Sequence, residues 1–246
     1  MSYISDFKSG PIELFKTDTD SSLATLVGTR FNTADGRQVV LAQASSATTV
    51  ATGKLYAAPA TVANHQNMAT STASAGATTI TVTLGNTAAT ANQYAGGYLL
   101  LNAGTGLGQT LRIQSHPAAN ASATLTLTLE DPVVTATSSS DTKSCLLLNP
   151  YKNVIISPTT NTGAIVGVAL YPIAASSYGY FVVKGPAAAL ADATAPAIGC
   201  AISWSAATAG AVGATPYAGN VLTGNVIGYA AQAATSAEYR GVILNL

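Results

Sequence analysis

Few side chains of this chain could perform chemistry, and those few are scattered. His65 and His116 are the only histidines. His65 lies in a stretch of small polar residues and His116 directly precedes a proline, and neither has a Cys or acidic neighbour at the spacing of a metal site. We therefore interpret both as loop histidines. The ten carboxylates form no pair suited to general acid–base work, so the sequence predicts no catalytic residue, no metal site and no enzyme.

Two short patterns resemble ligand-binding loops. Gly104-Thr105-Gly106-Leu107-Gly108 has the glycine spacing of a phosphate loop, but it leads into a predicted strand, whereas such a loop must open a helix. We interpret it as a hairpin loop. Asp18-Thr19-Asp20-Ser21-Ser22 alternates oxygen-bearing side chains as calcium loops do, but it lacks the glycine and the bidentate glutamate. The sequence therefore predicts no bound cofactor.

Two cysteines complete the set of reactive side chains. Cys145 and Cys200 each lie in an apolar run that predicts a strand. We interpret both as buried free thiols of a protein folded in a reducing cytosol, as in a bacterial host cytoplasm. A single disulfide between them is the alternative.

The composition restricts the partners that the chain can have. Only 8% of the 246 residues are charged and the formal net charge is zero, against about 25% charged residues in an average soluble domain. Such a chain does not attract nucleic acid or an anionic membrane through its overall field. Charged residues interrupt the N-terminal region where a signal peptide would lie, and no apolar run is long enough to predict a membrane span. Low charge also favours self-association, so we expect a homo-oligomer.

Strict alternation of apolar residues with threonine marks the middle of the chain. Thr79–Leu84 and Ala123–Glu130 both show it, and because side chains alternate faces along a strand, their apolar residues should line one core. Residues 61–77 are polar and small, and we interpret them as a linker or long loop. The predicted core of the middle block is Ile80, Val82, Leu84, Leu111, Ile113, Leu125, Leu127 and Leu129.

The two ends of the chain have a different texture, with fully apolar runs interrupted by glycine. Asp35-Gly36 separates Leu26–Phe31 from Arg37–Ala42, and this dipeptide favours the positive φ of a hairpin turn. Gly167 and its counterparts inside later runs predict bends or bulges. Ala187–Ala193 could form one short turn of helix.

These patterns predict an all-β protein with a discontinuous organisation. We expect an extended N-terminal arm at residues 1–22 and a barrel-like domain built from residues 23–65 and 158–246. A small β-sandwich or barrel, residues 66–157, should be inserted into that domain. Chain ends often lie close together, so an insertion of this kind is physically easy.

Aromatic residues are the best candidates for contacts with a partner, because they combine a large apolar area with a polar group. Ordinary packing within the sheets is the competing interpretation for all of them. The predicted interface residues are Tyr3, Phe7 and Phe15 of the arm and Tyr178, Tyr180, Trp204 and Tyr217 of the C-terminal part.

Several runs resemble virion proteins of tailed bacteriophages, and most of all capsid decoration (cement) proteins. In that class a strand is followed by a turn, an Ala-rich stretch and a final strand, and the opening hairpin at Leu26–Leu41 is also similar. The runs that carry the resemblance are Gly179–Gly185, Ile198–Ser203, Gly224–Ala230 and Tyr239–Leu246.

The resemblance implies a role on the outer surface of a capsid. Decoration proteins of this class usually bind as trimers and clamp neighbouring copies of the major capsid protein against the pressure of the packaged DNA. An inserted block would then project outward from the shell. The alternative is a host-recognition module of a tail or head fibre, in which Trp204 and the tyrosines would stack on a surface glycan.

Overall fold

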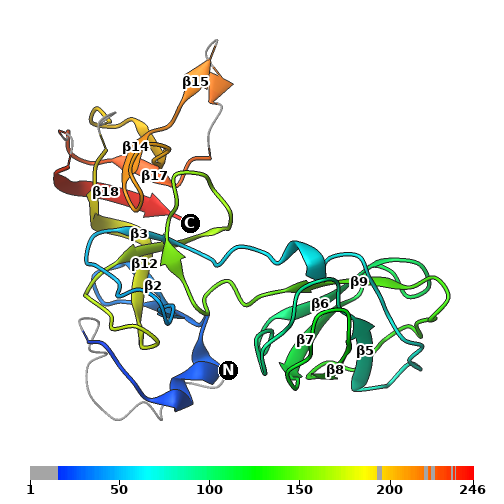
Figure 1. Cartoon of the computed structure of the whole chain (residues 1–246). Helices are drawn as coiled ribbons and strands as arrows, with labels where there is room; N and C mark the ends of the chain where they lie inside the picture. The colour runs from blue at the N-terminus through cyan, green and yellow to red at the C-terminus, as the bar shows by residue number, and fades with distance from the viewer. Residues whose placement is uncertain (1–15, 193–195, 219–220, 223–224, 234, 236) are drawn as a thin grey trace. The chain divides into compact units, whose positions relative to one another are not determined.

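The chain forms two compact β units in a computed structural model that describes residues 16–192, 196–218, 221–222, 225–233, 235 and 237–246 (Figure 1). The first unit combines Met1–Ala58 with Tyr151–Leu246, and the second is Pro59–Pro150. The all-β class and the barrel-like unit built from both ends of the chain are confirmed. Both observed boundaries lie on the N-terminal side of the predicted ones at residues 66 and 157. None of the described helices is long and apolar enough to span a membrane.

A ten-stranded antiparallel sheet forms the first unit, in the order β10-β3-β11-β12-β18-β17-β13-β14, with β2 on β12 and β1 on β2. A short 3-10 helix, η1 (Ser21–Leu26), precedes the sheet, and β15 pairs separately with β16. The strands are β1 (Arg30–Asn32), β2 (Gln38–Gln43), β3 (Leu55–Ala57), β10 (Ile155–Ile156), β11 (Ile165–Ala169), β12 (Tyr178–Leu190), β13 (Ala201–Trp204), β14 (Val212–Ala214), β15 (Tyr217–Ala218), β16 (Val221–Leu222), β17 (Gly228–Ala230) and β18 (Tyr239–Asn245).

Both faces of this sheet are covered around β2, which explains its uninterrupted apolar sequence. Val39 and Leu41 belong to one buried cluster, whereas Val40 and Ala42 belong to another. A strand buried on both faces needs apolar residues at every position, so it loses the alternation of a one-sided strand. The Asp-Gly turn is confirmed as a hairpin that joins β1 to β2, with Gly36 at φ 82°.

Strand β12 organises the first unit because it pairs with three other strands. Its first half pairs with β2 and β11, and its second half pairs with β18. The predicted helical turn at Ala187–Ala193 is wrong, since Ala187–Leu190 are part of β12. Alanine favours helix by only a fraction of a kcal/mol per residue, about 0.5, and the ladder with β18 outweighs that preference.

The described end of the predicted arm is bound to the sheet. Asp18 and Tyr178 exchange both of their backbone hydrogen bonds, at 3.0 and 2.8 Å. The carboxylate of Asp20 accepts a hydrogen bond from the peptide N–H of Ser22 at 2.9 Å and caps η1, so this segment uses its oxygens for a turn. Tyr3, Phe7 and Phe15 lie outside the described residues.

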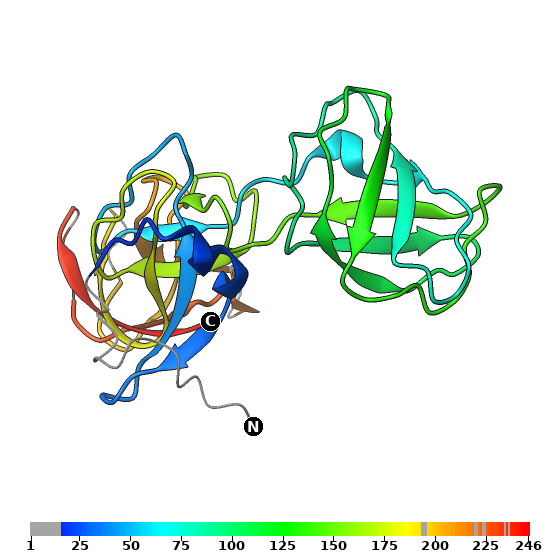
Figure 2. The same cartoon turned by 90° about the horizontal axis from the view of Figure 1, so that it is seen from below.

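The second unit is a nearly closed antiparallel barrel (Figure 2). Its strand order is β4-β9-β6-β7-β8-β5, and the bridge between Thr70 and Val82 brings the first strand back to the last. A backbone hydrogen bond of 2.9 Å from Ser71 to Thr81 reinforces this closure. Its elements are η2 (Ala63–His65), β4 (Met68–Ala69), β5 (Thr79–Thr83), β6 (Tyr98–Ala103), β7 (Thr110–Ser115), β8 (Thr124–Leu129) and β9 (Lys143–Leu147).

The predicted core of the middle block is confirmed. All eight residues named above are at most 3% exposed and belong to one cluster inside the barrel. Ile80 lies directly opposite Leu127 in the β5–β8 pair, so the apolar faces of both strands are in register. The loop Gly104–Gly108 joins β6 to β7 as a hairpin, as predicted.

Two further predictions about this chain are wrong. Residues 61–77 are not a linker, since they contain η2 and β4 and the bridge that closes the barrel. Both cysteines are free, but Cys145 is only half-buried and Cys200 is exposed. Cys200 directly precedes β13, and its carbonyl accepts a hydrogen bond from the N–H of Ala230 at 2.9 Å, but the residue itself is exposed.

Candidate interaction surface

The two histidines are buried structural residues of the barrel. Nε2 of His65 donates to the carbonyl of Thr87 at 2.9 Å, and its Nδ1 accepts from the hydroxyl of Tyr94. Nε2 of His116 accepts from the peptide N–H of Tyr94 at 3.0 Å, and its Nδ1 donates to the carbonyl of Pro117 at 2.8 Å. All four ring nitrogens are therefore engaged within the fold. Burial raises the pKa of Tyr94 to about 12.

The described residues were compared for clusters of side chains that could hold a metal ion. Within them, no group of three or more His, Cys, Asp or Glu side chains lies close enough to hold a metal ion.

The predicted aromatic interface is only partly available to a partner. Tyr178 is 6% exposed and its hydroxyl accepts a hydrogen bond from the side chain of Gln43 at 3.3 Å. Tyr180 is half-buried and packs edge-on against Phe31, and Trp204 packs against the same cluster. Tyr217 lies in β15, and its side chain is outside the described residues. Tyr178, Tyr180 and Trp204 therefore contact the core of their own chain.

A different set of apolar side chains faces solvent, on the outer face of the sheet formed by β12, β18, β17 and β13. Ile243 lies opposite Pro186 on one side and Tyr229 on the other, and Tyr229 lies opposite Ala201. Tyr229 is 52% exposed and Ile243 is 43% exposed. We call this row of four residues, together with Tyr239, the outer face.

The outer face carries no charged side chain within its central row. On β18, Val242 and Leu244 point into the core. Because side chains alternate between the two faces of a strand, Gly241 and Ile243 are on the outward side. Tyr239 is 49% exposed, and a Cβ at Gly53 would lie 2.6 Å from its ring, so the ring covers that glycine. The sequence alone could not identify this face, because a fully apolar run does not show which of its alternating side chains are buried and which face solvent.

A groove of 450 Å³ opens beside the outer face. Pro186–Ala188 of β12 form one wall, and Val168–Leu170 and Thr52 form the rest of its apolar and neutral lining. Asp35 and Arg37 from the tip of the β1–β2 hairpin also line it. The groove therefore combines small apolar side chains with one ion pair.

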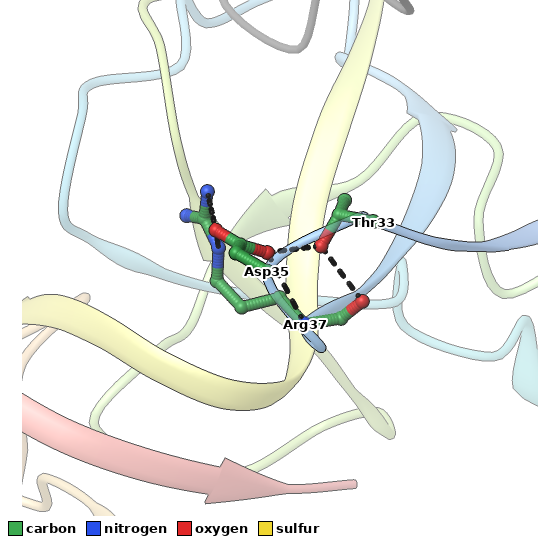
Figure 3. Close-up of polar contacts among 3 residues, drawn as sticks. All are labelled: Thr33, Asp35 and Arg37. Carbon is green, nitrogen blue, oxygen red and sulfur yellow. Dashed lines mark hydrogen bonds and ion pairs between the residues drawn. The ribbon is translucent and has the colours of Figure 1, made fainter.

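The ion pair is built by the hairpin turn itself (Figure 3). Nε and Nη2 of Arg37 each lie 2.7 Å from Oδ2 of Asp35, and the hydroxyl of Thr33 contacts the same carboxylate. The hydrogen bond from Thr33 and the contacts with Arg37 lower the pKa of Asp35 below its ordinary value. The carboxylate is exposed, so this pair orders the turn and adds little stability.

Comparisons of the chain with models of protein families, with curated proteins and with solved structures found no match.

Proposed function

We propose that this chain is a structural protein of a phage particle, which decorates the capsid by binding neighbouring capsid subunits through the outer face of its first unit. The observation that carries the proposal is the row of Pro186, Ile243, Tyr229 and Ala201 across four paired strands. Large apolar side chains gathered in an uncharged row on a sheet face are typical of protein interaction sites. The outer capsid surface as the location and a trimer as the bound state come from the resemblance.

The size of the outer face suits binding to a lattice. The exposed parts of Tyr229, Tyr239 and Ile243 amount to roughly 250–300 Å² of apolar area, given about 150–250 Å² for a whole aromatic side chain. At about 25 cal/mol per Å² this gives roughly 7 kcal/mol, which is comparable with the about 4–15 kcal/mol cost of association. One such contact is weak, so stable binding requires further contacts or several copies on one surface.

The two-unit design agrees with this role. The C-terminal residue is held in the sheet, where the N–H of Leu246 donates to the carbonyl of Val183 at 2.9 Å. The inserted barrel has its own core and closes its strand order on itself. A shell-binding unit can therefore carry an additional domain without using that domain for its own packing.

The test is cosedimentation of the full chain with capsids of a phage that encodes it, prepared without the protein. We expect the wild-type chain to pellet with the capsids and an Ile243→Asp variant to pellet at least tenfold less. Ile243 is exposed, so the variant should keep the wild-type unfolding temperature. Thr124→Asp, at an exposed position in the barrel, is the matched control and should bind as the wild type does. Binding to host cells in place of capsids would support a glycan-recognition module and contradict the proposal.

A further inference from the structure

The connection from β5 to β6, residues 84–97, carries an aromatic side chain into the barrel core. Tyr94 is 0% exposed and belongs to the same buried cluster as the leucines of the strands. The connection runs beside the segment that follows β7, where Ala89 and Ala119 exchange both of their backbone hydrogen bonds at 2.9 Å. His116 lies in that segment, so it faces the part of the connection that carries Tyr94.

His116 binds the connection through three hydrogen bonds. Its carbonyl accepts the N–H of Asn92 at 3.0 Å, and its own N–H donates to Oδ1 of Asn92 at 3.0 Å. The third bond uses the ring, whose Nε2 accepts the N–H of Tyr94 at 3.0 Å. The residue is 4% exposed. One of the three bonds therefore depends on the protonation state of a buried imidazole.

The partners of the ring fix that protonation state. Nδ1 of His116 lies 2.8 Å from the carbonyl oxygen of Pro117, which can only accept, so Nδ1 carries the hydrogen. Nε2 faces the peptide N–H of Tyr94, which can only donate, so Nε2 carries none. A proton on Nε2 would turn the acceptor into a second donor and direct two N–H groups at each other. The folded barrel therefore accommodates only the neutral ring.

We propose that His116 is an acid-sensitive latch, whose protonation detaches the connection that carries Tyr94 and destabilises the barrel while the first unit stays folded. A histidine in an unfolded chain takes up a proton near its ordinary pKa of about 6.5. Below that pH the unfolded barrel binds one proton that the folded barrel excludes. By linkage, the stability that the neutral ring provides is complete above this pH and is lost as the pH falls below it.

Two titratable groups belong to the same cluster as this ring. The rings of Tyr94 and His116 lie 5.8 Å apart at an angle of 38°, and the hydroxyl of Tyr94 contacts Nδ1 of His65. Burial raises the pKa of Tyr94 to about 12, so its phenol is neutral under acid conditions and offers no charge that would stabilise an imidazolium. The side chain of Asn92, which contacts the N–H of His116, is a neutral amide.

His65 provides a comparison within the same cluster, because its hydrogen bonds do not have fixed directions at both nitrogens. Nε2 of His65 donates to the carbonyl of Thr87 at 2.9 Å, and Nδ1 accepts from the hydroxyl of Tyr94. A hydroxyl can donate or accept, so it can turn and accept from a protonated Nδ1. Protonation of His65 therefore keeps both of its hydrogen bonds, whereas protonation of His116 breaks one.

The test is calorimetry of the full chain at pH 7.5 and pH 5.0. Both histidines lie in the barrel unit and the first unit contains none, so the first unit is an internal control. For one excluded proton, the unfolding equilibrium constant of the barrel should rise about 30-fold between these pH values. The unfolding temperature of the barrel should fall by roughly 8–16 °C, and that of the first unit should fall by much less.

Two matched variants assign the effect to one ring. Glutamine places a non-titrating amide near the position of Nε2, so His116→Gln keeps an acceptor for the N–H of Tyr94, and the barrel transition should shift by less than about 4 °C between the two pH values. His65→Gln should retain most of the wild-type shift. Nuclear magnetic resonance of the histidine rings at pH 7.5 should show the Nδ1–H tautomer for His116.

Three results would overturn the inference. They are a wild-type barrel transition that does not move between pH 7.5 and pH 5.0, a pH-dependent shift that disappears in His65→Gln and persists in His116→Gln, and an Nε2–H tautomer of His116. If His116→Gln does not fold, the ring resonances of the wild type decide alone. His116 must then stay neutral in the folded barrel at pH 5.0, and a protonated His116 in a folded barrel contradicts the latch.

Discussion

Leu127 in the barrel core provides the sharpest test of the division into two units. Its side chain is 0% exposed and lies opposite Ile80 inside the second unit. Leu127→Ala removes buried methyl groups and leaves a cavity, which costs about 3–5 kcal/mol in well-packed cores. For a domain of this size each kcal/mol lowers the unfolding temperature by about 4–8 °C. We therefore expect the barrel transition to fall by at least about 12 °C.

Thr126 is the matched control, because it is the neighbouring residue on the solvent side of the same strand. Thr126→Ala should change the stability by less than about 0.5 kcal/mol. Differential scanning calorimetry of the full chain should resolve two transitions, and only the transition of the barrel should move in Leu127→Ala. Leu127→Asp should abolish that transition, because an unpaired buried carboxylate costs several kcal/mol, about 3 or more.

The division is refuted if Leu127→Ala shifts one transition that both units share. It is also refuted if Thr126→Ala destabilises the protein as much as Leu127→Ala does, because Leu127 would then not be the inward residue. A fragment of residues 59–150 offers an independent check. It should unfold cooperatively at the temperature of the barrel transition in the full chain.

Three further substitutions test particular contacts. Gly104 and Gly108 share one loop and both have positive φ, but a Cβ at Gly104 would lie 2.2 Å from a backbone oxygen of the adjacent loop, whereas nothing lies within 4 Å of a Cβ at Gly108. Denaturant unfolding should show that Gly104→Ala lowers the free energy of unfolding by about 2 kcal/mol or more beyond the loss caused by Gly108→Ala. Tyr56→Phe removes the hydroxyl that accepts the N–H of Ala51 at 2.7 Å, and calorimetry should show a loss of about 1 kcal/mol in the first unit alone. The pKa of Tyr94 is raised from 10.0 to about 12, so the protonated hydroxyl stabilises the folded barrel fully below pH 10.0. This stabilisation is lost as the pH rises toward 12. Unfolding titrations at alkaline pH should show the loss in the wild type, and Tyr94→Phe should abolish it.

The sequence determined the barrel core well because its strands are one-sided. Alternation of threonine with leucine or valine allows only one face of β5 and β8 to be buried, and a slip by one residue would expose every leucine. The polar stretch at residues 61–77 lacked such a pattern. It became part of the barrel through η2, β4 and the bridge from Thr70 to Val82, which depend on contacts with residues distant in sequence.

The interaction surface could not be predicted in the same way. Tyr180 and Tyr229 both lie in apolar runs with glycine nearby, yet Tyr180 packs against Phe31 and Tyr229 is 52% exposed. Which side of such a run faces solvent depends on the register with neighbouring strands, and that register is fixed by pairing between residues far apart in the chain. The number of aromatic residues therefore indicates that the protein has an interaction surface, whereas only the fold shows which residues form it.

The two units differ in their strand edges: the barrel has almost no open edge, whereas the first unit keeps a short one. This difference limits edge-to-edge association between copies of the chain. The barrel returns its last strand to its first, so its closure leaves little edge for another chain. Strand β12 keeps a short open segment, in which Pro186 offers no N–H, while Arg37 and Tyr239 close the two ends. An edge of this length cannot support a growing sheet, since a growing sheet needs a longer run of donors and acceptors. The short edge matters in a chain with zero net charge, because little charge repulsion between copies opposes the growth of a shared sheet.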